Sequence, residues 1–274
     1  MSTGCLSNNR RIIALVATCN RQQLLLSRAL PSINIQSSPC DHVVLIDDGD
    51  QRVDRAQIEH FSSECDLPIS LLTNRRTKGA SGAWNTGIDH LARNCLDPSL
   101  VYVALLDDDD AWYSSHLALI ESAIDEGAEV IATGFRRLVD TEPGEVMMPP
   151  QELRPSDFLV GNPGIQPTSL VVRLDRLLEA GGFDEALYSC TDRDLCIRLG
   201  RLPGIQYQAL NQITADHFAC TNRARLCTPG SAARTSGLQG FFSKHSPEMN
   251  TAQEVGFRER AESLFNWSPD LAFE

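Results

Sequence analysis

Apolar and polar positions recur with two different periods along residues 11–135. Short apolar runs bounded by polar residues are typical of buried strands. They predict strands at Ile12–Ala17, His42–Ile46, Ile69–Leu72, Val101–Leu106 and Val130–Gly134. Between these runs, apolar residues at helical spacing predict helices at Gln22–Ile33, Asp54–Cys65, Ser81–Leu96 and Ser115–Glu126. The alternation predicts an α/β fold with a mostly parallel sheet and helices on both faces.

The second half of the chain is less regular. Its prolines predict a loop over Thr141–Pro155. The remaining patterns predict strands at Leu170–Val172 and Ile213–His217 and helices at Leu174–Ala180, Asp192–Leu199 and Ala252–Phe265. We therefore expect a flexible N-terminal tail over residues 1–10, a domain over 11–220 and a helical or irregular C-terminal extension over 221–274.

Composition narrows the class of protein. The chain has 274 residues, of which 42% are hydrophobic and 22% charged, as in ordinary soluble globular proteins. Its formal net charge of −12 argues against nucleic acid or an anionic membrane surface as a partner. No apolar run reaches the ~18–20 residues of a transmembrane segment, and the polar start lacks the apolar core of a signal peptide. We expect a cytoplasmic protein whose oligomeric state the sequence leaves open.

Nine cysteines are scattered along the chain without a C-x-x-C pair. Reduced thiols are therefore expected, rather than a disulfide framework or a zinc site.

Polar clusters follow three of the expected strands, at Thr18–Arg21, Asp47–Asp48 and Asp107–Asp110. Open α/β sheets bind their ligands at the carboxyl ends of the strands. Four adjacent aspartates repel one another, which is explained if a cation lies beside them. Oxygen ligands suit a hard cation such as Mg²⁺ or Mn²⁺, and Mg²⁺ is usually shared with substrate phosphates. The alternative is a solvated acidic turn that caps the next helix.

A second anion-binding feature precedes the helix at Ser81–Leu96. Gly79, Ser81 and Gly82 open this helix, and its unbonded N–H groups favour an anion. The same residues could equally be ordinary capping residues. Nearby cations could neutralise phosphate, although surface solvation is the alternative for at least two of Arg75, Arg76 and Lys78.

Five motifs occur in a defined order: VATCNR, VVLIDDGD, KGASGAWNTGID, ALLDDDDAW and GGFDEALYSCTDRDLCIRLG. On these motifs, residues 11–220 resemble the family-two glycosyltransferases, which have the GT-A fold of the nucleotide-diphospho-sugar transferases. The resemblance implies a nucleotide-sugar-binding half over 11–135 and an acceptor-binding half over 136–220. Two positions depart from the family pattern, because Thr191 stands where Glu is usual and Trp84 where Arg is frequent.

The resemblance also implies an activity. It is the metal-dependent, inverting transfer of one sugar from a nucleotide-diphosphate sugar, with a UDP-sugar favoured, to the hydroxyl of an unidentified acceptor. The cofactor would be Mn²⁺ or Mg²⁺. Asp109 matches the principal metal ligand, and Asp107 faces the ribose hydroxyls and can also hold the metal. His217 matches a late metal or phosphate ligand of several members, with a buried structural histidine as the alternative.

Further residues are assigned to the nucleotide sugar by the same resemblance. Asp48 would accept the ring N–H of uracil, unless it only shapes the turn before Gly49. The other members of this set are Thr18, Asn20, Gly79, Ser81, Asn85 and Asp108. Simple turn chemistry is the alternative for Thr18 and Asn20. Asp108 and Asp110 could instead be solvated or cap the helix after Trp112.

Asp192 matches the general base, which takes the proton of the acceptor hydroxyl. The alternative is a capping box between Thr191 and Asp194, with Asp192 merely favouring the helix dipole. A carboxylate at a helix start is stabilised as the anion, so we expect Asp192 to be ionised at neutral pH.

Two other classes of protein remain. A sugar-1-phosphate nucleotidyltransferase would carry a glycine-rich loop of the G-x-G-T-R type after the first strand, and VATCNRQQ lacks one. A non-catalytic homologue that only binds nucleotide sugar would not need both Asp109 and Asp192.

Overall fold

The computed structural model describes residues 10–140, 142–219 and 231–268. In this part of the chain one sheet contains nine strands. They are β1 (Arg11–Thr18), β2 (His42–Asp47), β3 (Ile69–Thr73), β4 (Val101–Asp107), β5 (Ala111–Trp112), β6 (Val130–Val139), β7 (Glu142–Met147), β8 (Leu170–Arg173) and β9 (Tyr207–Ala219). The strands lie in the order β3-β2-β1-β4-β8-β6-β9-β5, and β7 pairs with β6.

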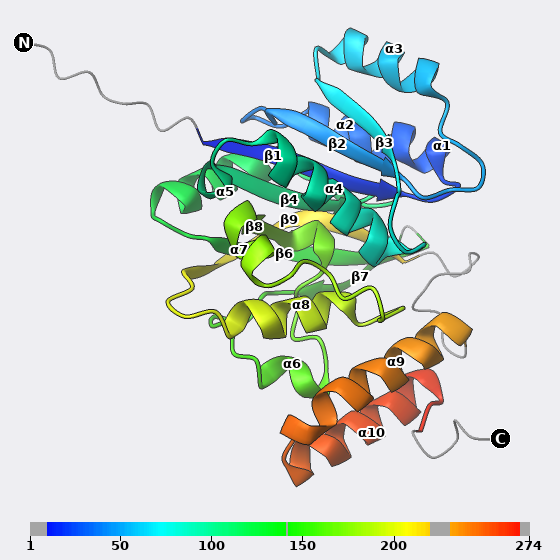
Figure 1. Cartoon of the computed structure of the whole chain (residues 1–274), viewed down its shortest axis with the longest axis vertical. Coiled ribbons are helices and arrows are strands. Elements are labelled where there is room, and N and C mark those ends of the chain that lie inside the picture. The colour runs from blue at the N-terminus through cyan, green and yellow to red at the C-terminus, as the bar shows by residue number, and fades with distance from the viewer. Residues whose placement is uncertain (1–9, 141, 220–230, 269–274) are drawn as a thin grey trace, which may run out of the picture.

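Helices cover both faces of this sheet (Figure 1). One continuous helical segment consists of α1 (Gln22–Leu24), the π-helical turn η1 (Leu25–Ala29) and α2 (Leu30–Asn34). The longer helices are α3 (Arg55–Cys65), α4 (Ala80–Asn94), α5 (His116–Asp125), α8 (Thr191–Gly200), α9 (Ala232–His245) and α10 (Thr251–Phe265). The short ones are α6 (Asp157–Val160), α7 (Leu174–Glu179) and the 3₁₀ turns η2 (Pro98–Leu100), η3 (Pro167–Ser169) and η4 (Ser246–Glu248).

The period of two along the strands divides the apolar residues between two cores. In β1, Ile13 and Leu15 face the core under α4, whereas Ala14 and Val16 face the core under α2 and α5. Because successive strand side chains point to opposite faces, a continuous apolar run is what a strand covered on both faces requires. All four residues are buried.

The α/β class and the parallel first half of the sheet are confirmed. β1 pairs in parallel with both β2 and β4, and β2 with β3. The second half is mixed, since β8 runs antiparallel between β4 and β6, and β9 is parallel to β6.

Several elements differ from the expectation, including the short β5 and α6, which were not predicted. β7 forms a hairpin with β6 where a loop was expected, and β9 begins at Tyr207 rather than Ile213. Helix α9 was not predicted at all, whereas α10 was. Among the described residues, no helix has the length and apolarity needed to cross a bilayer.

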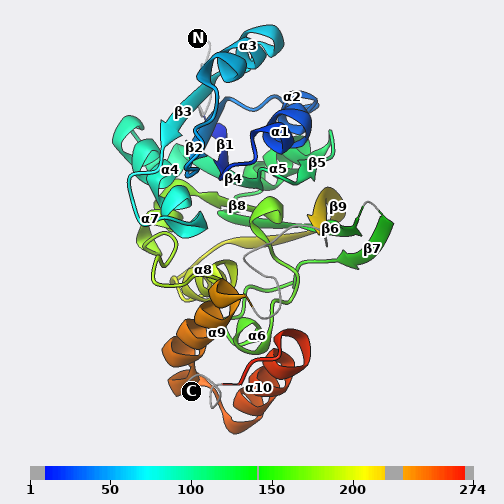
Figure 2. The same cartoon turned by 90° about the vertical axis from the view of Figure 1, so that its right-hand side faces the viewer.

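The helices α9 and α10 lie beyond α8 and α6 (Figures 1 and 2). Phe241 of α9, Phe257 of α10 and Trp267, which follows α10, belong to the same core as Ile13 and Leu15. These helices therefore complete the core on that face. The proposed boundary at residue 220 stays a prediction, and residues 1–9 and 221–230 of the expected tail and extension lie outside the described residues.

Candidate functional site

The register of the parallel strands brings three strand ends to one edge of the sheet. Thr18 pairs with Asp47, and Ala17 pairs with Asp107. The ends of β2, β1 and β4 are therefore level with one another, and Figure 2 faces this edge. The predicted convergence of Thr18, Asp48 and the aspartate run is thus present in the fold.

A network of hydrogen bonds joins the end of β1 to the aspartate run. Thr18 Oγ1 donates to Asp108 Oδ2 at 2.6 Å, and Arg21 Nε donates to the same oxygen at 3.1 Å. Arg21 also bonds Asp109 Oδ2 through Nη1 at 3.0 Å. Arg21 is therefore one cation beside the aspartates, and the sequence predicted no role for it. In the sequence, this residue is marked only as the single arginine at the end of the VATCNR motif.

The pKa values of Asp107, Asp108 and Asp110 are shifted, and not all in the same direction. Burial raises the pKa of Asp107 to about 8, and the negative charges of Asp110 and Asp109 add to this shift. Burial also raises the pKa of Asp108 to about 6, although Arg21 and Thr18 oppose the shift. Burial would raise the pKa of Asp110 as well, but His217 and the other hydrogen-bond donors outweigh it and lower that pKa.

Asp110 forms hydrogen bonds to segments that are far away in the sequence. Its carboxylate accepts hydrogen bonds from Thr168 Oγ1 at 2.6 Å, from the Phe218 N–H at 3.0 Å and from His217 Nδ1 at 2.9 Å. Asp108 and Asp110 are both fully buried. The expectation that either is solvated or caps the next helix is therefore wrong, and that helix carries no side-chain cap bond.

The donor set at this edge fits a cation that is shared with a ligand. Asp107 and Asp109 supply carboxylate oxygens, whereas His217 is held by Asp110. Among the described residues, no three His, Cys, Asp or Glu side chains form a complete metal site. Mg²⁺ and related ions commonly take one or two carboxylates and complete their shell with substrate phosphates and water. The residues present are sufficient for that arrangement.

Asp48 connects β2 to the start of α4. Asn74 Nδ2 donates to its Oδ1 at 2.6 Å, and the Gly79 N–H donates to its Oδ2 at 2.8 Å. Gly79 is the N-cap of α4, with φ of 123° and no side-chain cap bond. In the described part of the chain, the buried Ser81 Oγ has no hydrogen-bond partner. The helix start thus keeps polar groups at the predicted donor edge.

Asn85 and Asn20 bond protein groups in the structure. Asn85 Oδ1 accepts from the Phe183 N–H at 2.8 Å, and Asn85 Nδ2 donates to Glu185 Oε1 at 2.7 Å. Asn85 therefore holds the GGFDE motif against α4. Asn20 has a positive φ of 56°, and its Oδ1 accepts from the Gln51 N–H at 2.9 Å. Asn20 therefore shapes a turn, which is one of the two interpretations of this residue given by the sequence.

Of the nearby cations, two are paired with carboxylates. Arg76 bonds Glu185 at 2.5 Å and Asp89 at 2.9 Å, and Lys78 bonds Asp50 at 2.5 Å. Trp84, at the departure from the family pattern, is buried and stacks on Phe183 with ring centroids 6.1 Å apart.

Asp192 lies in the first turn of α8. The N-cap is Cys190, with φ of 63° and no side-chain cap bond, so the alternative of a capping box between Thr191 and Asp194 is wrong. Asn162 Nδ2 donates to Asp192 Oδ2 at 2.7 Å. Burial raises the pKa of Asp192 above its ordinary value, although the Arg193 N–H and nearby charges lower it. The helix start was expected to lower this pKa, but the effect of burial is larger.

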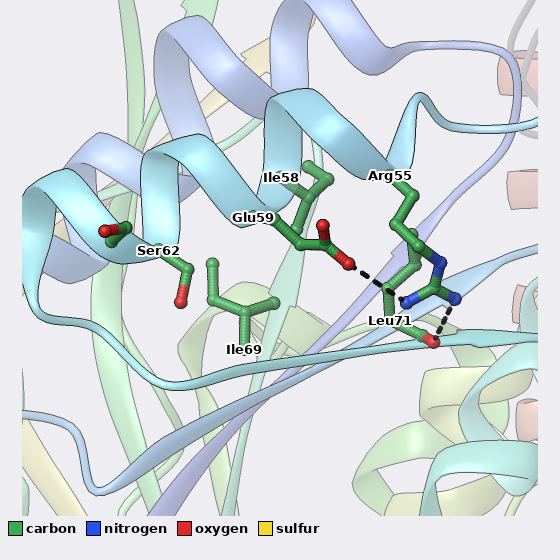
Figure 3. A pocket seen from close by; sticks show the side chains of 7 residues that line it. Arg55, Ile58, Glu59, Ser62, Ile69 and Leu71 are labelled. Carbon is green, nitrogen blue, oxygen red and sulfur yellow. Dashed lines mark hydrogen bonds and ion pairs between the residues drawn. The ribbon is translucent and has the colours of Figure 1, made fainter.

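Two cavities lie outside this strand-end cluster. One, of about 210 Å³, lies between α3 and the outer strand β3. There Arg55 Nη2 donates a hydrogen bond to Leu71 O at 3.3 Å (Figure 3). The other, of about 440 Å³, lies beside the GGFDE motif. Its lining is Arg76, Ala180, Gly181, Phe183, Asp184, Glu185, Arg198 and Lys244. Neither contains the strand-end aspartates.

The fold is similar to those of solved glycosyltransferases. S. aureus TarS in complex with UDP-GlcNAc superposes with a TM-score of 0.66 at 16% identity, covering 96% of this chain and 75% of that one. The mannosyltransferase PcManGT from Pyrobaculum calidifontis, in complex with GDP-Man and Mn²⁺, gives 0.59 at 15% identity, covering 92% and 75%. These likenesses define a GT-A fold.

The sequence identifies the family. Residues 13–178, more than half of the chain, match the model of glycosyl transferase family 2, and the chain belongs to that family. An uncharacterized glycosyltransferase of Haemophilus influenzae is 24% identical over 194 residues, or 67% of this chain. The amylovoran biosynthesis glycosyltransferase AmsB of Erwinia amylovora is 27% identical over 207 residues, or 70% of this chain. The matches span 60% and 64% of the lengths of these two relatives.

Proposed function

We propose that this protein is a metal-dependent, inverting glycosyltransferase that moves one sugar from a nucleotide-diphosphate sugar to an acceptor hydroxyl. The observation that carries the proposal is the level register of β2, β1 and β4, which gathers Asp48, Thr18 and the aspartate run at one edge. Carboxylates at this position are suited to a cation and a diphosphate. The family match supports the reaction class.

A UDP-sugar is the proposed donor. Asp48 can accept the uracil N–H, and its bonds to Asn74 and Gly79 already fix the direction of its carboxylate. The similar fold of TarS in complex with UDP-GlcNAc supports a UDP-sugar, whereas PcManGT in complex with GDP-Man keeps a GDP-sugar as the rival donor. Thr18, Asn20, Ser81, Asn85 and Asp108 line or brace this donor edge.

Asp109 and Asp107 are the proposed ligands of Mn²⁺ or Mg²⁺. When bound, the cation would neutralise the diphosphate as it leaves the sugar. Arg21, which bonds Asp108 and Asp109, supplies a second positive charge at the same place. His217 stays a predicted ligand, and Asp110 fixes the position of its imidazole.

Asp192 is the proposed base. Its carboxylate takes the proton of the acceptor hydroxyl while that oxygen attacks the sugar carbon opposite the diphosphate. Burial raises the pKa of Asp192, which makes the ionised carboxylate a stronger base. One displacement by one base inverts the anomeric configuration.

The test is a donor panel on the wild-type protein and Asp109→Asn. Thermal shifts are measured with UDP-, dTDP- and GDP-sugars, each with and without Mn²⁺. A ligand at 100 times its dissociation constant adds about 2.7 kcal/mol to the free energy of unfolding. We expect a metal-dependent shift with a UDP-sugar that Asp109→Asn loses, and that the exposed-site control Glu59→Gln keeps.

Equal donor affinity and equal metal dependence in the wild type and Asp109→Asn would contradict the assignment. Hydrolysis of the donor without acceptor separates an enzyme from a non-catalytic binding homologue. Consumption of a nucleoside triphosphate with a sugar phosphate would instead identify a nucleotidyltransferase.

A further inference from the structure

Helix α9 lies directly against the segment that leads into α8. A Cβ atom placed on Gly237 would lie 2.0 Å from Ser189 Oγ, so only glycine permits this approach. Arg234 Nη1 lies 3.8 Å from the sulfur of Cys190, the N-cap of α8. The start of α8, and with it Asp192, is thus packed against a helix that the family match over residues 13–178 does not include.

Asp194 of α8 forms a second contact between α8 and α9. It is fully buried, and its carboxylate bonds His245 Nε2 at 2.9 Å and Lys244 Nζ at 2.6 Å, both from α9. Arg198, on α8 itself, bonds it at 2.7 Å. Burial would raise the pKa of Asp194, but these donors outweigh it and lower that pKa. The charged Asp194 therefore holds α8 and α9 in one orientation.

Two arginines lie at the start of α8, Arg193 on α8 itself and Arg234 on α9, and they differ in their partners. Arg193 donates to Phe158 O at 2.7 Å and to Leu159 O at 2.9 Å, and it stacks on Phe241 at 4.1 Å. Arg193 is thus engaged in holding α6 and α9 together.

Arg234 has no such engagement. Its guanidinium lies 3.8 Å over the Phe265 ring, which fixes its plane. In the described part of the chain it forms no ion pair with a carboxylate, and its buried Nε lacks a hydrogen-bond partner. Its contact with Cys190, two residues before Asp192, places its positive charge beside the start of α8, where it lowers the pKa of Asp192.

We propose that Arg234 is a positioning residue for Asp192, and that α9 with α10 is in this way part of the catalytic unit. The inference rests on the proposed function of Asp192 as the base. Asp192 must be ionised to accept the hydroxyl proton, and its burial opposes ionisation. A fixed cation from α9 offsets that burial without a hydrogen bond that would occupy the carboxylate.

The other groups around Asp192 do not replace this cation. On α8 they are Arg193, Asp194 and Cys196, of which only Arg193 is positive and already bonds backbone carbonyls. Asn162, which donates to Asp192, is neutral. Removing the charge of Arg234 therefore leaves the burial of Asp192 less compensated.

The experiment compares Arg234→Met, Arg234→Gln and Arg234→Lys with the wild type. The first readout is the pH profile of kcat/KM for transfer, measured beside the donor dissociation constant and the Tm. We expect the acidic limb to move up by about one pH unit in Arg234→Met and Arg234→Gln, since an opposite charge nearby typically shifts a carboxyl pKa by about that much. Arg234→Lys should keep the wild-type limb.

The matched control is Arg258→Met on α10, because Arg258 also stacks on an aromatic ring, Phe242, at 4.8 Å. It should leave the limb in place. An unmoved limb in folded Arg234→Met and Arg234→Gln, or an equal movement in Arg258→Met, would overturn the proposal.

A second readout does not depend on activity. The ¹³C carboxyl resonance of Asp192, assigned by its loss in Asp192→Asn, is titrated in the wild type and in Arg234→Gln. A midpoint that rises in Arg234→Gln supports the proposal, and an unchanged midpoint refutes it. If the wild-type protein transfers no sugar, the proposed function fails while this titration still decides the role of Arg234.

Discussion

At the scale of single residues, Asp192 shows how one carboxylate can be both partly buried and placed at a helix start. Burial disfavours its charge, whereas the Arg193 N–H and the two arginine charges favour it. Asn162 then fixes one carboxylate oxygen at 2.7 Å. This bond holds the direction of the carboxylate that we propose as the base.

Asp192→Asn is expected to keep the fold and lose transfer. The amide oxygen of asparagine can still accept the bond from Asn162, so the Tm and the UDP dissociation constant should stay near those of the wild type. Without a base, the transfer rate should fall by roughly 10²–10⁴-fold. All three quantities are measured on the same preparations.

A folded, donor-binding Asp192→Asn that transfers at the wild-type rate would refute the role of base. The product anomer is an independent check, because retention of the donor configuration would exclude a single displacement.

Asp48→Ala is expected to weaken UDP binding and leave the affinity for Mn²⁺ alone unchanged. The substitution removes the acceptor for a uracil N–H and releases Asn74 and Gly79. One hydrogen bond is worth about 1 kcal/mol, so the dissociation constant should rise at least about fivefold. Calorimetric titration measures it, with Asp50→Ala as the control, since exposed Asp50 lies on the same loop as Asp48 and pairs with Lys78 of the loop before α4. An unchanged UDP constant would show that Asp48 only shapes the turn.

The sequence located the strand-end residues but not their partners. Thr18, Asp48 and Asp107 were found because an apolar run marks where each strand ends. The partner of Thr18 is 90 residues away in sequence, and that of Asn85 is 98 residues away. No local pattern carries such pairings. For this reason the bracing roles of Asn85 and Arg21 emerged only from the fold.

At the scale of elements, α9 and β7 were missed because their local signals are weak. The buried residues of α9 lie on one face, but that face includes Gly237 and His245, so its apolar stripe is short. Strand β7 carries Pro143 and pairs only with β6, as expected for an edge strand. Helix α4 was predicted well because Trp84, Ile88 and Leu91 lie on one buried face.

Gly87→Ala is a test of how closely α4 approaches the sheet. Replacing a helical glycine by alanine normally stabilises a helix by about 0.5–1 kcal/mol. At Gly87 the added Cβ would lie 2.2 Å from Leu15 Cδ1, inside the core. We expect the cost of overpacking to exceed this gain, so that the protein is destabilised by about 1–3 kcal/mol.

Urea unfolding of Gly87→Ala and Gly256→Ala provides the comparison. Gly256 lies in α10, where the added Cβ would be 3.3 Å from Val160 Cγ1, so a smaller penalty is expected. A Gly87→Ala protein as stable as the wild type would mean that β1 and α4 can separate slightly without cost.

At the scale of the whole molecule, one buried histidine makes global stability depend on pH. Burial lowers the pKa of His116 to about 3, from 6.5 in the unfolded chain. Between these values the unfolded state binds a proton that the folded state does not. The free energy of unfolding therefore falls as the pH drops below 6.5, by up to about 1.4 kcal/mol per pH unit, until the pH reaches the folded-state pKa.

His116→Phe should make this acid-induced loss shallower. The phenyl ring can keep the stack on Trp112, whose centroid lies 4.5 Å from that of His116, and Thr214 keeps its bond to Thr133. Unfolding free energies of both proteins are measured from pH 4 to pH 7. Parallel pH profiles would show that His116 titrates alike in the folded and unfolded states.

The bonds of Asp110 also set the order in which the site becomes complete during synthesis. Its carboxylate binds His217, which is 107 residues further along the chain. A ribosome that adds roughly 5–20 residues per second needs roughly 5–20 s to cover that distance. The aspartate run leaves the ribosome first and lacks these bonds until β9 has followed. Stalled chains that end before β9 should bind UDP more weakly than those in which β9 has emerged, so the nascent protein is kept from its donor until most of it has been made.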